Sequence, residues 1–455
     1  MLPQTVLDRF VENCPAAVLV RATLERLLSP ARLDAIFAAA TDRQYTRELL
    51  FSEIVALMVG VATGVFRSVH AAYLAAREKL GVSATALYGK LSRLELNISE
   101  ALIRDTAKDM STAIDAMPKA RREVLPGYEV FYLDGNHLAA TEHRIEELRT
   151  TNSGPLPGQT LALMDAQRDL ITELVMCEDG HAQERSLLNQ LLLRITSKSV
   201  IVADRNFCTT GFVFGLMARP AYFAIRQHAT NLPWERKGKR RRVGRCETGV
   251  VYEQAIEIRQ GDEVKTLRRI TVKLDAPTED GDTEIHIVSN LPKRVSAVKI
   301  AELYRSRWTI EGAFQILTDV LRCEIETLGH PKAALFSFAV AVLAYNSYAV
   351  VKAAMRSAHG AKAVDEKFSD YHFIHDVVMT TVGMSIAVEP ESWSRYAKMT
   401  LEELAAELVR LAKGVKLSRY PKKKRGPKKP PPKRTSGRGR PHVSTARLLA
   451  ASREK

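Results

Sequence analysis

Five short apolar segments after residue 128 constrain the fold of this chain more than any other feature. They lie within YEVFYLDG, PGQTLALMDAQRDLITELVMCED, SVIVADRNF and AYFAIRQ, and the second of these stretches holds two. Their lengths and their β-branched and aromatic residues indicate strands, and the continuous apolar run SVIVA is typical of a strand inside a sheet. HAQERSLLNQLLLRI and TGFVFGLMA are predicted helices between the later strands. The order strand, strand, strand, helix, strand, helix, strand predicts an α/β core.

The rest of the chain divides around this core by changes in pattern. Residues 1–120 carry apolar residues at steps of three and four, which predicts a helical N-terminal domain. Residues 121–228 and 296–412 make up the two parts of the core, and the second part continues into C-terminal helices. Residues 229–295 alternate and turn at QGDE, which predicts an inserted all-β module. We expect this module to lie outside the core sheet and to expose its basic cluster, Arg236–Arg245.

One stretch of the N-terminal region, Leu80–Leu94, is similar to a helix-turn-helix. Its sequence LGVSATALYGKLSRL places a glycine and then Ser83, a suitable N-cap, before an apolar helix. Many helical hairpins share this pattern. Two interpretations therefore remain, a contact with DNA or simple packing between helices.

The positive charge of the chain is concentrated near its C-terminal end. The formal net charge is +15, and residues 413–455 contain sixteen Lys and Arg residues but one acid, Glu454. Residues 1–412 are therefore neutral overall. A segment so rich in cations, Pro and Gly is predicted to be a disordered tail that attracts nucleic acid, or else a solvated end without a ligand. Arg438 and Arg440, in GRGRP, resemble the core of an AT-hook, and general phosphate attraction is the alternative.

The cysteines and apolar segments favour a cytoplasmic protein that does not span a membrane. The five cysteines are scattered without a C-x-x-C pair, which argues against zinc and redox motifs and fits a reducing compartment. The stretch MLPQTVLDRFVENC carries early acids and lacks the pattern of a signal peptide. Ala333–Val351 has no charged residue and is long enough to span a membrane, but its Tyr, Asn and Ser residues favour a helix buried in a large domain.

Two of the predicted strands end in aspartate. Asp134 closes FYLD and Asp204 closes VIVAD, which places both carboxylates at the rim of a sheet, where sites are commonly built. A single aspartate at a strand end is usually a turn former. The pair carries more weight because a glycine follows the first aspartate directly and the second begins the motif DRNF.

A third carboxylate comes from the segment YRSRWTIEGAFQIL. Steps of three and four residues place Tyr304, Arg307 and Glu311 on one face of a helix. Three carboxylates from two strand ends and one helix can hold two Mg²⁺ or Mn²⁺ ions about 4 Å apart, the arrangement used in phosphoryl transfer. Arginine is a forked phosphate donor and tyrosine offers a hydroxyl, so Tyr304 and Arg307 are predicted to contact DNA phosphates.

Other polar residues near the predicted strand ends have a structural alternative. Asp165, at the end of LALMD, is predicted to be a turn residue rather than a ligand. The charged cluster Glu178–Arg185 fits the first turn of a helix, with a role near the metal ions as the alternative. Arg226 leaves a strand at the rim and is a candidate DNA contact. Trp234 is expected to be buried, with stacking on an unpaired base as the alternative.

Together these motifs resemble those of the DDE transposases of bacterial insertion sequences, in the group with a Tyr-Arg-Glu-Lys helix. The resemblance spans Tyr128–Asn346 and rests on Y-x-x-R-x-x-x-E, DG after one strand, DR-F after another, SNLP before the helix and a β insertion. It implies a ribonuclease H-like core. It also implies that Asp134, Asp204 and Glu311 are catalytic and hold two Mg²⁺ or Mn²⁺ ions.

The resemblance further implies contacts with DNA. Tyr304 and Arg307 would bind phosphates or element ends. The family lysine, seven residues after Glu311, falls at Thr318 in this chain. Arg322, one turn later, is the candidate for the same phosphate.

These observations lead to three functional hypotheses. The first is a transposase that cleaves phosphodiesters at element ends and transfers the strand into target DNA, as a homodimer on DNA in the bacterial cytoplasm. The second is an inactive or repurposed DNA-binding protein with the same fold. The third is a nuclease without strand transfer. Metal-dependent cleavage separates the first two hypotheses, and joined products separate the first from the third.

Overall fold

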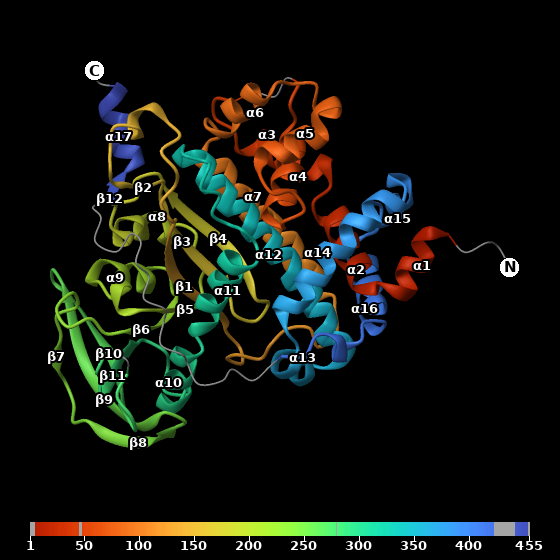
Figure 1. Ribbon diagram of the computed structural model, residues 1–455. Helices are drawn as coiled ribbons and strands as arrows, with labels where there is room; N and C mark the ends of the chain where they lie inside the picture. The colour runs from red at the N-terminus through yellow and green to blue at the C-terminus, as the bar shows by residue number, and fades with distance from the viewer. Residues whose placement is uncertain (1–4, 45–47, 279, 423–441, 454–455) are drawn as a thin grey trace.

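The centre of the molecule is a mixed sheet (Figure 1). The computed structural model describes residues 5–44, 48–278, 280–422 and 442–453. The strand order is β4-β3-β1-β5-β6-β11-β10-β9-β7, and β8 pairs with β9. The strands of this sheet are β1 (Glu129–His137), β3 (Gln159–Asp165), β4 (Leu170–Cys177), β5 (Ser199–Ala203), β6 (Tyr222–Arg226), β7 (Glu235–Arg236), β8 (Arg241–Cys246), β9 (Gly249–Gln260), β10 (Glu263–Leu274) and β11 (Glu284–Ser289).

The strands predicted from the central apolar segments are confirmed as β1, β3, β4, β5 and β6. β5 and β6 run parallel to β1, whereas β3 is antiparallel to β1 and β4 is antiparallel to β3. The connections hold η2 (Glu184–Leu187), α8 (Leu188–Leu192) and α9 (Thr210–Ala218). The helix expected over HAQERSLLNQLLLRI is therefore shorter than predicted. Because β1, β5 and β6 are parallel, their carboxyl ends meet at one edge of the sheet, which we call the rim.

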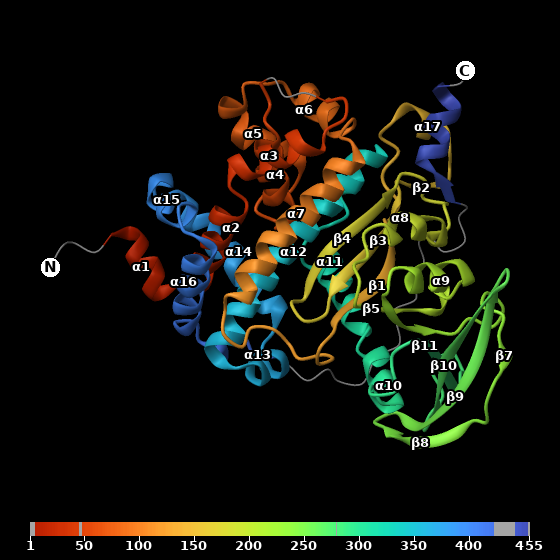
Figure 2. The same ribbon diagram turned by 180° about the vertical axis from the view of Figure 1, so that it is seen from behind.

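Helices cover both faces of the sheet. One face packs against α7 (Leu96–Asp115), α10 (Ala297–Arg305), α11 (Trp308–Asp319) and α12 (Pro331–His359). Val130 and Tyr132 of β1 point to this face, and Leu133 points to the other, where α8 and α9 pack, as the alternation of a strand requires. Figure 2 shows α7 and α12 side by side along the sheet, and the two helices are in contact.

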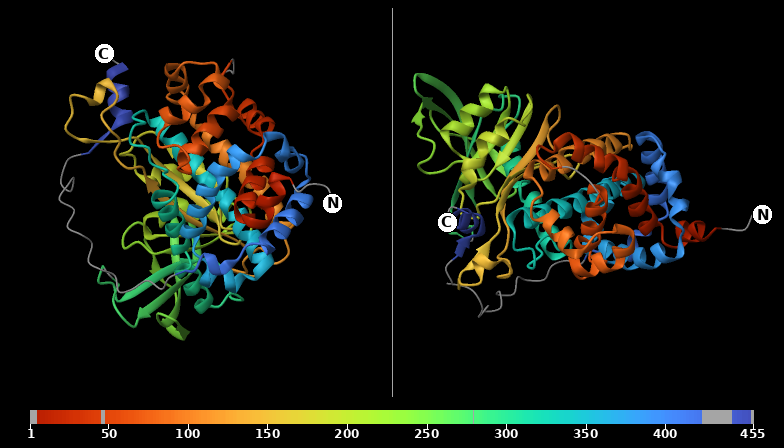
Figure 3. Two further views of the ribbon diagram at one scale, coloured as in Figure 1. Left: turned by 45° about the vertical axis from the view of Figure 1, so that its right-hand side comes forward. Right: turned by 90° about the horizontal axis from the view of Figure 1, so that it is seen from above.

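The helices near the two ends of the chain form one body beside the sheet (Figure 3). Helix α16 packs on α2 and α7, and α14 packs on α2. The N-terminal region is helical as predicted, but it shares its core with the C-terminal helices. The helices of this body, besides α7 and α12, are α1 (Val6–Asn13), α2 (Pro15–Leu27), α3 (Pro30–Ala40), α4 (Phe51–Ala62), α5 (Val69–Leu80), α6 (Ala84–Leu91), α13 (Ala361–Lys367), α14 (Asp370–Ala387), α15 (Ser394–Ala397) and α16 (Leu401–Lys413).

Helices α5 and α6 form the two-helix turn expected at Leu80–Leu94. Gly81 ends α5 with a φ of 64°, a conformation that favours glycine. Ser83 caps α6, because its hydroxyl accepts a hydrogen bond from the amide of Ala86. The contact of this motif with DNA stays a prediction.

The long apolar helix α12 is a core helix. Among the helices of the described residues, α12 is long and apolar enough to cross a membrane, yet its most apolar window is entirely buried inside the protein. This agrees with the burial predicted for Ala333–Val351. Its Asn346 completes the edge strand β4, since the side-chain amide donates to Ile171 O at 2.7 Å and accepts from Ile171 N at 2.9 Å. Glu100 of α7 accepts from Met176 N in the same way. This edge of the sheet is therefore paired and covered.

The β-rich region after β6 differs from the prediction in its placement. It is β-rich, and the Lys and Arg residues of its basic cluster, Arg236–Arg245, are exposed as expected. It does not lie outside the core sheet, however. β11 pairs with β6 in antiparallel register, Val288 opposite Ile225, so the hairpin β9–β10 extends the core sheet. The alternation in sequence predicts strands but does not determine which edge they join.

The C-terminal end also differs from the prediction of a fully disordered tail. Tyr420 is buried and donates a hydrogen bond to Asp376. β12 (His442–Ser444) pairs in parallel with β2 (Gly154–Leu156), and α17 (Thr445–Arg453) follows (Figure 1). Disorder is therefore the wrong prediction for residues 413–422 and 442–453. Arg438 and Arg440 lie outside the described residues.

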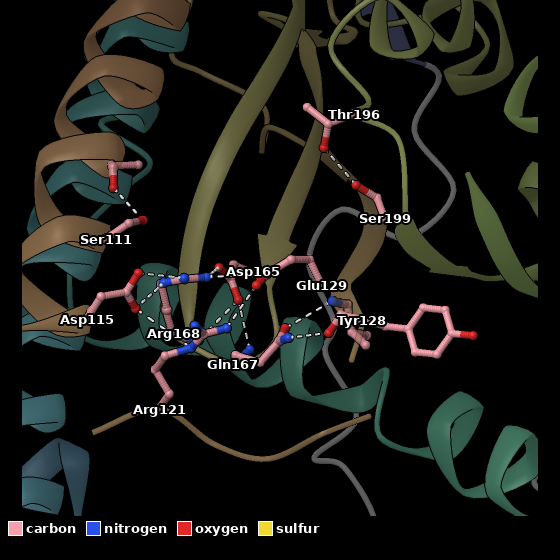
Figure 4. Close-up of polar contacts among 12 residues, drawn as sticks. Ser111, Asp115, Arg121, Tyr128, Glu129, Asp165, Gln167, Arg168, Thr196 and Ser199 are labelled. Carbon is pink, nitrogen blue, oxygen red and sulfur yellow. Dashed lines mark hydrogen bonds and ion pairs between the residues drawn. The ribbon is translucent and has the colours of Figure 1, made fainter. Parts of the chain in front are cut away.

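A polar network closes the end of the sheet opposite the rim (Figure 4). The Asp165 carboxylate accepts from the backbone amides of Gln167 and Arg168 and forms an ion pair with the Arg168 guanidinium. Arg168 also pairs with Asp115 of α7 and with Glu129 of β1. Asp165 is thus the predicted turn residue, and the Arg168 that it holds fastens α7 to the sheet through Asp115.

We predict that Asn346→Ala destabilises the fold more than Ser347→Ala. The first change leaves both backbone groups of Ile171 unpaired in a buried site, which costs about 2–4 kcal/mol. Ser347 bonds only Leu343 O of its own helix, so its removal is expected to cost less than about 1 kcal/mol. Urea denaturation measures both. Equal destabilisation would show that Asn346 does not hold the edge strand.

Candidate active site

The two strand-end aspartates lie side by side at the rim. The last registered pair between the parallel strands β1 and β5 is Leu133 with Ala203, and Asp134 and Asp204 are the next residues on the two strands. The register therefore brings together two carboxylates that are 70 residues apart in sequence. The two aspartates thus lie at one edge of one sheet, as their strand-end positions predict, and their role as metal ligands stays a prediction.

The segment YRSRWTIEGAFQIL contributes a third carboxylate and two more polar groups. It is not one helix, because α10 ends at Arg305 and α11 begins at Trp308, with Arg307 as the N-cap residue of α11. The backbone of Ser306 and Arg307 stays in the right-handed helical region, so Tyr304, Arg307 and Glu311 still face the rim together. This packing places the helical residues over β1 and β5.

Arg307 joins the carboxylates of β1 and α11. Its Nη1 lies 2.9 Å from Asp134 Oδ2, and its Nη2 lies 2.7 Å from Glu311 Oε1. The Arg307 side chain is only 7% exposed. The Tyr304 hydroxyl, also buried, donates to Asp204 Oδ1 at 3.3 Å. Strand β1, strand β5 and the α10–α11 segment thus meet through charged and polar contacts.

The electrostatics of the site reflect burial among several acids. The pKa of Asp134 is raised to about 6, chiefly by burial; Arg307 opposes the rise, and the charges of Glu311 and Glu184 add to it. Burial, with the charge of Asp204, raises the pKa of Tyr304 to about 12. Tyr304 is therefore a neutral donor at physiological pH.

The carboxylate oxygens of the site suit a hard divalent cation, provided that the contacts of Arg307 with Asp134 and Glu311 rearrange. All three acids offer only oxygen, the ligand that Mg²⁺ and Mn²⁺ prefer. The hydrogen bonds of the site engage Oδ1 of Asp204 and Oε1 of Glu311. Within the described part of the chain, however, no group of three or more His, Cys, Asp or Glu side chains lies close enough to hold a metal ion. A metal would have to share Asp134 and Glu311 with the Arg307 guanidinium.

The other predicted DNA contacts lie around the rim but outside this cluster. Arg226, at the end of β6, pairs with Asp282 at 2.5 Å and lines a cavity of about 360 Å³. Trp234 lines the same cavity, half-buried, with the Arg269 guanidinium 4.9 Å from its ring centroid. Arg322 is exposed and lines a second cavity of about 360 Å³, together with Thr318 and residues of the N-terminal helical body.

One residue of the site was not singled out by its sequence. Glu184, in the charged cluster Glu178–Arg185, lies against Gly135 and accepts a hydrogen bond from Asn206. The sequence favoured a helix terminus here, with a role near the site as the alternative. The structure places Glu184 beside both strand ends. The only signal in the sequence was an acid soon after the third strand, which is too common to identify it.

Residues 126–346 match the family model of the transposase DDE domain. This region, which contains Asp134, Asp204 and Glu311, therefore belongs to the transposase DDE domain family. No curated protein matches the chain.

Among solved structures, the chain is similar to the piggyBac transposase in the cryo-EM structure of its synaptic complex with hairpin DNA. The two are 12% identical, the match covers 86% of each chain, and the TM-score is 0.38. A TM-score this low does not establish a shared fold.

We predict that Arg307→Met destabilises the metal-free protein, because Asp134 and Glu311 lose their shared cation. Removing one partner of a fully buried pair costs about 3–5 kcal/mol; Glu311 is one-third exposed, so we expect a destabilisation of about 1–3 kcal/mol. Chemical denaturation with a chelator present measures it. Arg305→Met is the control, because Arg305 pairs with Glu247 at the surface and should contribute less than about 1 kcal/mol. Equal effects would contradict a structural role for Arg307.

Proposed function

We propose that this protein is a transposase that cleaves phosphodiesters at the ends of a DNA element with divalent metal ions and joins the freed end to target DNA. The observation that carries the proposal is the meeting of Asp134, Asp204 and Glu311 at one sheet edge within the region that matches the transposase DDE domain. The strand order β4-β3-β1-β5-β6, with one antiparallel and one parallel side to β1, is the order expected of a ribonuclease H-like core.

Each residue of the cluster has a part in this proposal. Asp134, Asp204 and Glu311 would hold Mg²⁺ or Mn²⁺, and two such ions supply an activated nucleophile and neutralise the leaving oxygen. Tyr304 is neutral and donates its hydroxyl hydrogen to Asp204 in this structure, and the same hydroxyl would turn to a phosphate oxygen when DNA is bound. Arg307 keeps Asp134 and Glu311 in place before metal and DNA arrive, and its planar fork is also suited to a phosphate.

The surroundings of the rim suit a long polyanion. Arg226, Arg205 and Arg269 line one cavity, and Arg322 and Arg67 line the other. We further propose that the protein acts as a homodimer on DNA, with one copy for each element end, in the bacterial cytoplasm as part of an insertion sequence. Arg438 and Arg440 would add contacts to the A·T-rich minor groove.

One observation favours an inactive DNA-binding protein as the second candidate function. The Arg307 guanidinium already neutralises Asp134 and Glu311, so the carboxylates have a partner without any metal ion. A protein that had lost catalysis could keep this arrangement as a structural ion pair.

Cleavage of DNA from the borders of the encoding gene separates the two functions. We expect cleavage and joining with Mg²⁺ or Mn²⁺ and none with a chelator. Asp134→Asn, Asp204→Asn and Glu311→Gln should each reduce cleavage more than about 100-fold, because a bound metal lowers the activation barrier by several kcal/mol. The control is Glu302→Gln, a surface residue of α10.

The outcomes are distinct. Binding without cleavage in the wild type favours the inactive protein, and cleavage without joined products favours a nuclease. If the three acid variants cleave as well as the wild type, the cluster is not the active site.

We predict that the cations of residues 423–441 strengthen DNA binding through counterion release. Changing the nine Lys and Arg residues of this segment to Gln should flatten the salt dependence, by about 0.9 in log–log slope for each phosphate that the segment neutralises. Cleavage at saturating DNA should persist, because Asp134, Asp204 and Glu311 are untouched. The matched variant Arg438→Ala with Arg440→Ala tests the groove contact on A·T-rich and G·C-rich DNA. Equal salt slopes would contradict a phosphate contact, and equal weakening on both DNAs would contradict the AT-hook.

A further inference from the structure

The backbone ladder between β1 and β5 stops at the two strand-end aspartates. β5 ends at Ala203, and the ladder with β1 ends at the pair Leu133–Ala203. β1 continues to His137, but beyond Leu133 it pairs only with β3. Beyond this last pair, the spacing of the residues that follow Leu133 and Ala203 depends on side chains. Arg307 and Tyr304 supply contacts from one face of the sheet.

Glu184 reaches the same strand ends from the other face. Gly135 and His137 alternate with Asp134 along β1, so they point away from Arg307. A Cβ on Gly135 would lie 2.1 Å from Glu184 Oε1, and His137 Nδ1 lies 3.6 Å from the same oxygen. The other carboxylate oxygen, Oε2, accepts a hydrogen bond from Asn206 Nδ2 at 2.5 Å. Glu184 thus touches the residue after Asp134 and the second residue after Asp204.

Gly135 leaves the room that this contact with Glu184 occupies. Gly135 does not have a positive φ, so its backbone conformation is open to other residues. The space is not, because the Glu184 carboxylate fills the position of a Cβ. In the DG motif after the first strand, the glycine is thus the residue on which the Glu184 carboxylate packs directly.

The loop that carries Glu184 is itself held in place by contacts with β3 and with the C-terminal residues. The amide of Gly180 donates to Ser444 Oγ at 3.2 Å, and Arg447 pairs with Asp179 at 2.6 Å. The side chain of Gln159 in β3 donates to Ala182 O. The loop is thus tied both to the core sheet and to the C-terminal strand. The Glu184 side chain itself is only 17% exposed.

From these contacts we infer that Glu184 is a positioning residue, which sets the spacing of Asp134 and Asp204 by joining Gly135 and Asn206 across the open end of the β1–β5 pair. This inference rests on the proposed function, because it assigns Glu184 to the site that Asp134, Asp204 and Glu311 form. Glu184 acts through its neighbours and is not itself assigned to the metal ions. Its removal would let the two strand ends separate, and a shift of about 1 Å costs about 100-fold in rate.

The test uses the Glu184–Asn206 pair and its reversal in the full-length protein. Glu184→Ala and Asn206→Asp should each weaken Mn²⁺ binding and slow cleavage about 10–100-fold, as removal of a supporting hydrogen bond commonly does. The double variant E184Q/N206D places an amide donor opposite a carboxylate, and it should restore most of the Mn²⁺ affinity and cleavage rate that Asn206→Asp alone removes. Glu178→Gln is the control, because Glu178 lies in the same loop but pairs with Lys332 at the surface.

Three measurements report the effect of these variants on metal binding, on cleavage and on local structure. Calorimetry gives the Mn²⁺ affinity without DNA, cleavage of labelled DNA gives the rate at saturation, and hydrogen exchange reports the protection of residues 204–207. We expect Glu184→Ala to lower all three and Glu178→Gln to lower none. The reversed pair is informative because it restores the amide–carboxylate hydrogen bond while it moves the charge to position 206, so recovery identifies the bond itself as what holds the two strand ends.

Failure of the inference is distinct from failure of the proposed function. If the wild type binds Mn²⁺ and cleaves DNA, and Glu184→Ala does the same at equal strength, the inference is wrong. A double variant no better than Asn206→Asp would also overturn it. If the wild type neither binds Mn²⁺ nor cleaves, the proposed function is wrong. Unchanged exchange at residues 204–207 in Glu184→Ala would then show that Glu184 does not hold the strand end.

Discussion

The arrangement of the rim depends on the ion pairs that the buried Arg307 guanidinium forms with Asp134 and Glu311. The guanidinium binds a strand carboxylate and a helix carboxylate at once, and it comes from the point where α10 ends and α11 begins. Arginine is suited to this position because its rigid fork presents two donors in one plane, so a single side chain sets the separation of Asp134 and Glu311. The segment after residue 296 is thereby fastened to a strand that begins at residue 129.

The sheet is extended on one side and closed on the other. On the β4 side, Asn346 of α12 and Glu100 of α7 occupy backbone groups that another strand would otherwise bind. On the β6 side, β11 continues the ladder and carries the β9–β10 hairpin with it. The rim therefore has a basic, strand-built wall on one flank and the helical body on the other.

The site is supported from both faces of the sheet. Alternation along β1 sends Asp134 toward Arg307 and Gly135 toward Glu184, so neighbouring residues engage different layers of the protein. Burial between these layers keeps several acids close together and raises the pKa of Asp134. Acids held at such a cost to stability are typical of functional sites rather than of ordinary sheet edges.

Many of the secondary-structure elements and several site residues could be predicted from the sequence alone. The lengths and residue types of the apolar segments predict β1, β3, β4, β5 and β6, because local propensity and periodicity act within a few residues. The same local rules predict the helical N-terminal region, the cap at Ser83 and the turn at Asp165. The spacing of Tyr304, Arg307 and Glu311 predicts a shared helix face, and that face survives the break before Trp308. Asp134 and Asp204 could be predicted because they end strands, and Glu311 because it follows Tyr304 and Arg307 at helical spacing.

Only the tertiary structure decided the rest, because it depends on pairing between residues distant in the chain. A hairpin pattern does not show which edge it will join, so the union of β11 with β6 could not be read from alternation. Composition predicted disorder for the whole basic tail, but three residues at His442–Ser444 find a partner strand 288 positions earlier in the chain. Glu184 looks like any acid near a helix start until packing places it over Gly135. The parallel register of β1 and β5 makes one site of two aspartates, since backbone hydrogen bonds, and not side-chain type, set which strand ends lie together.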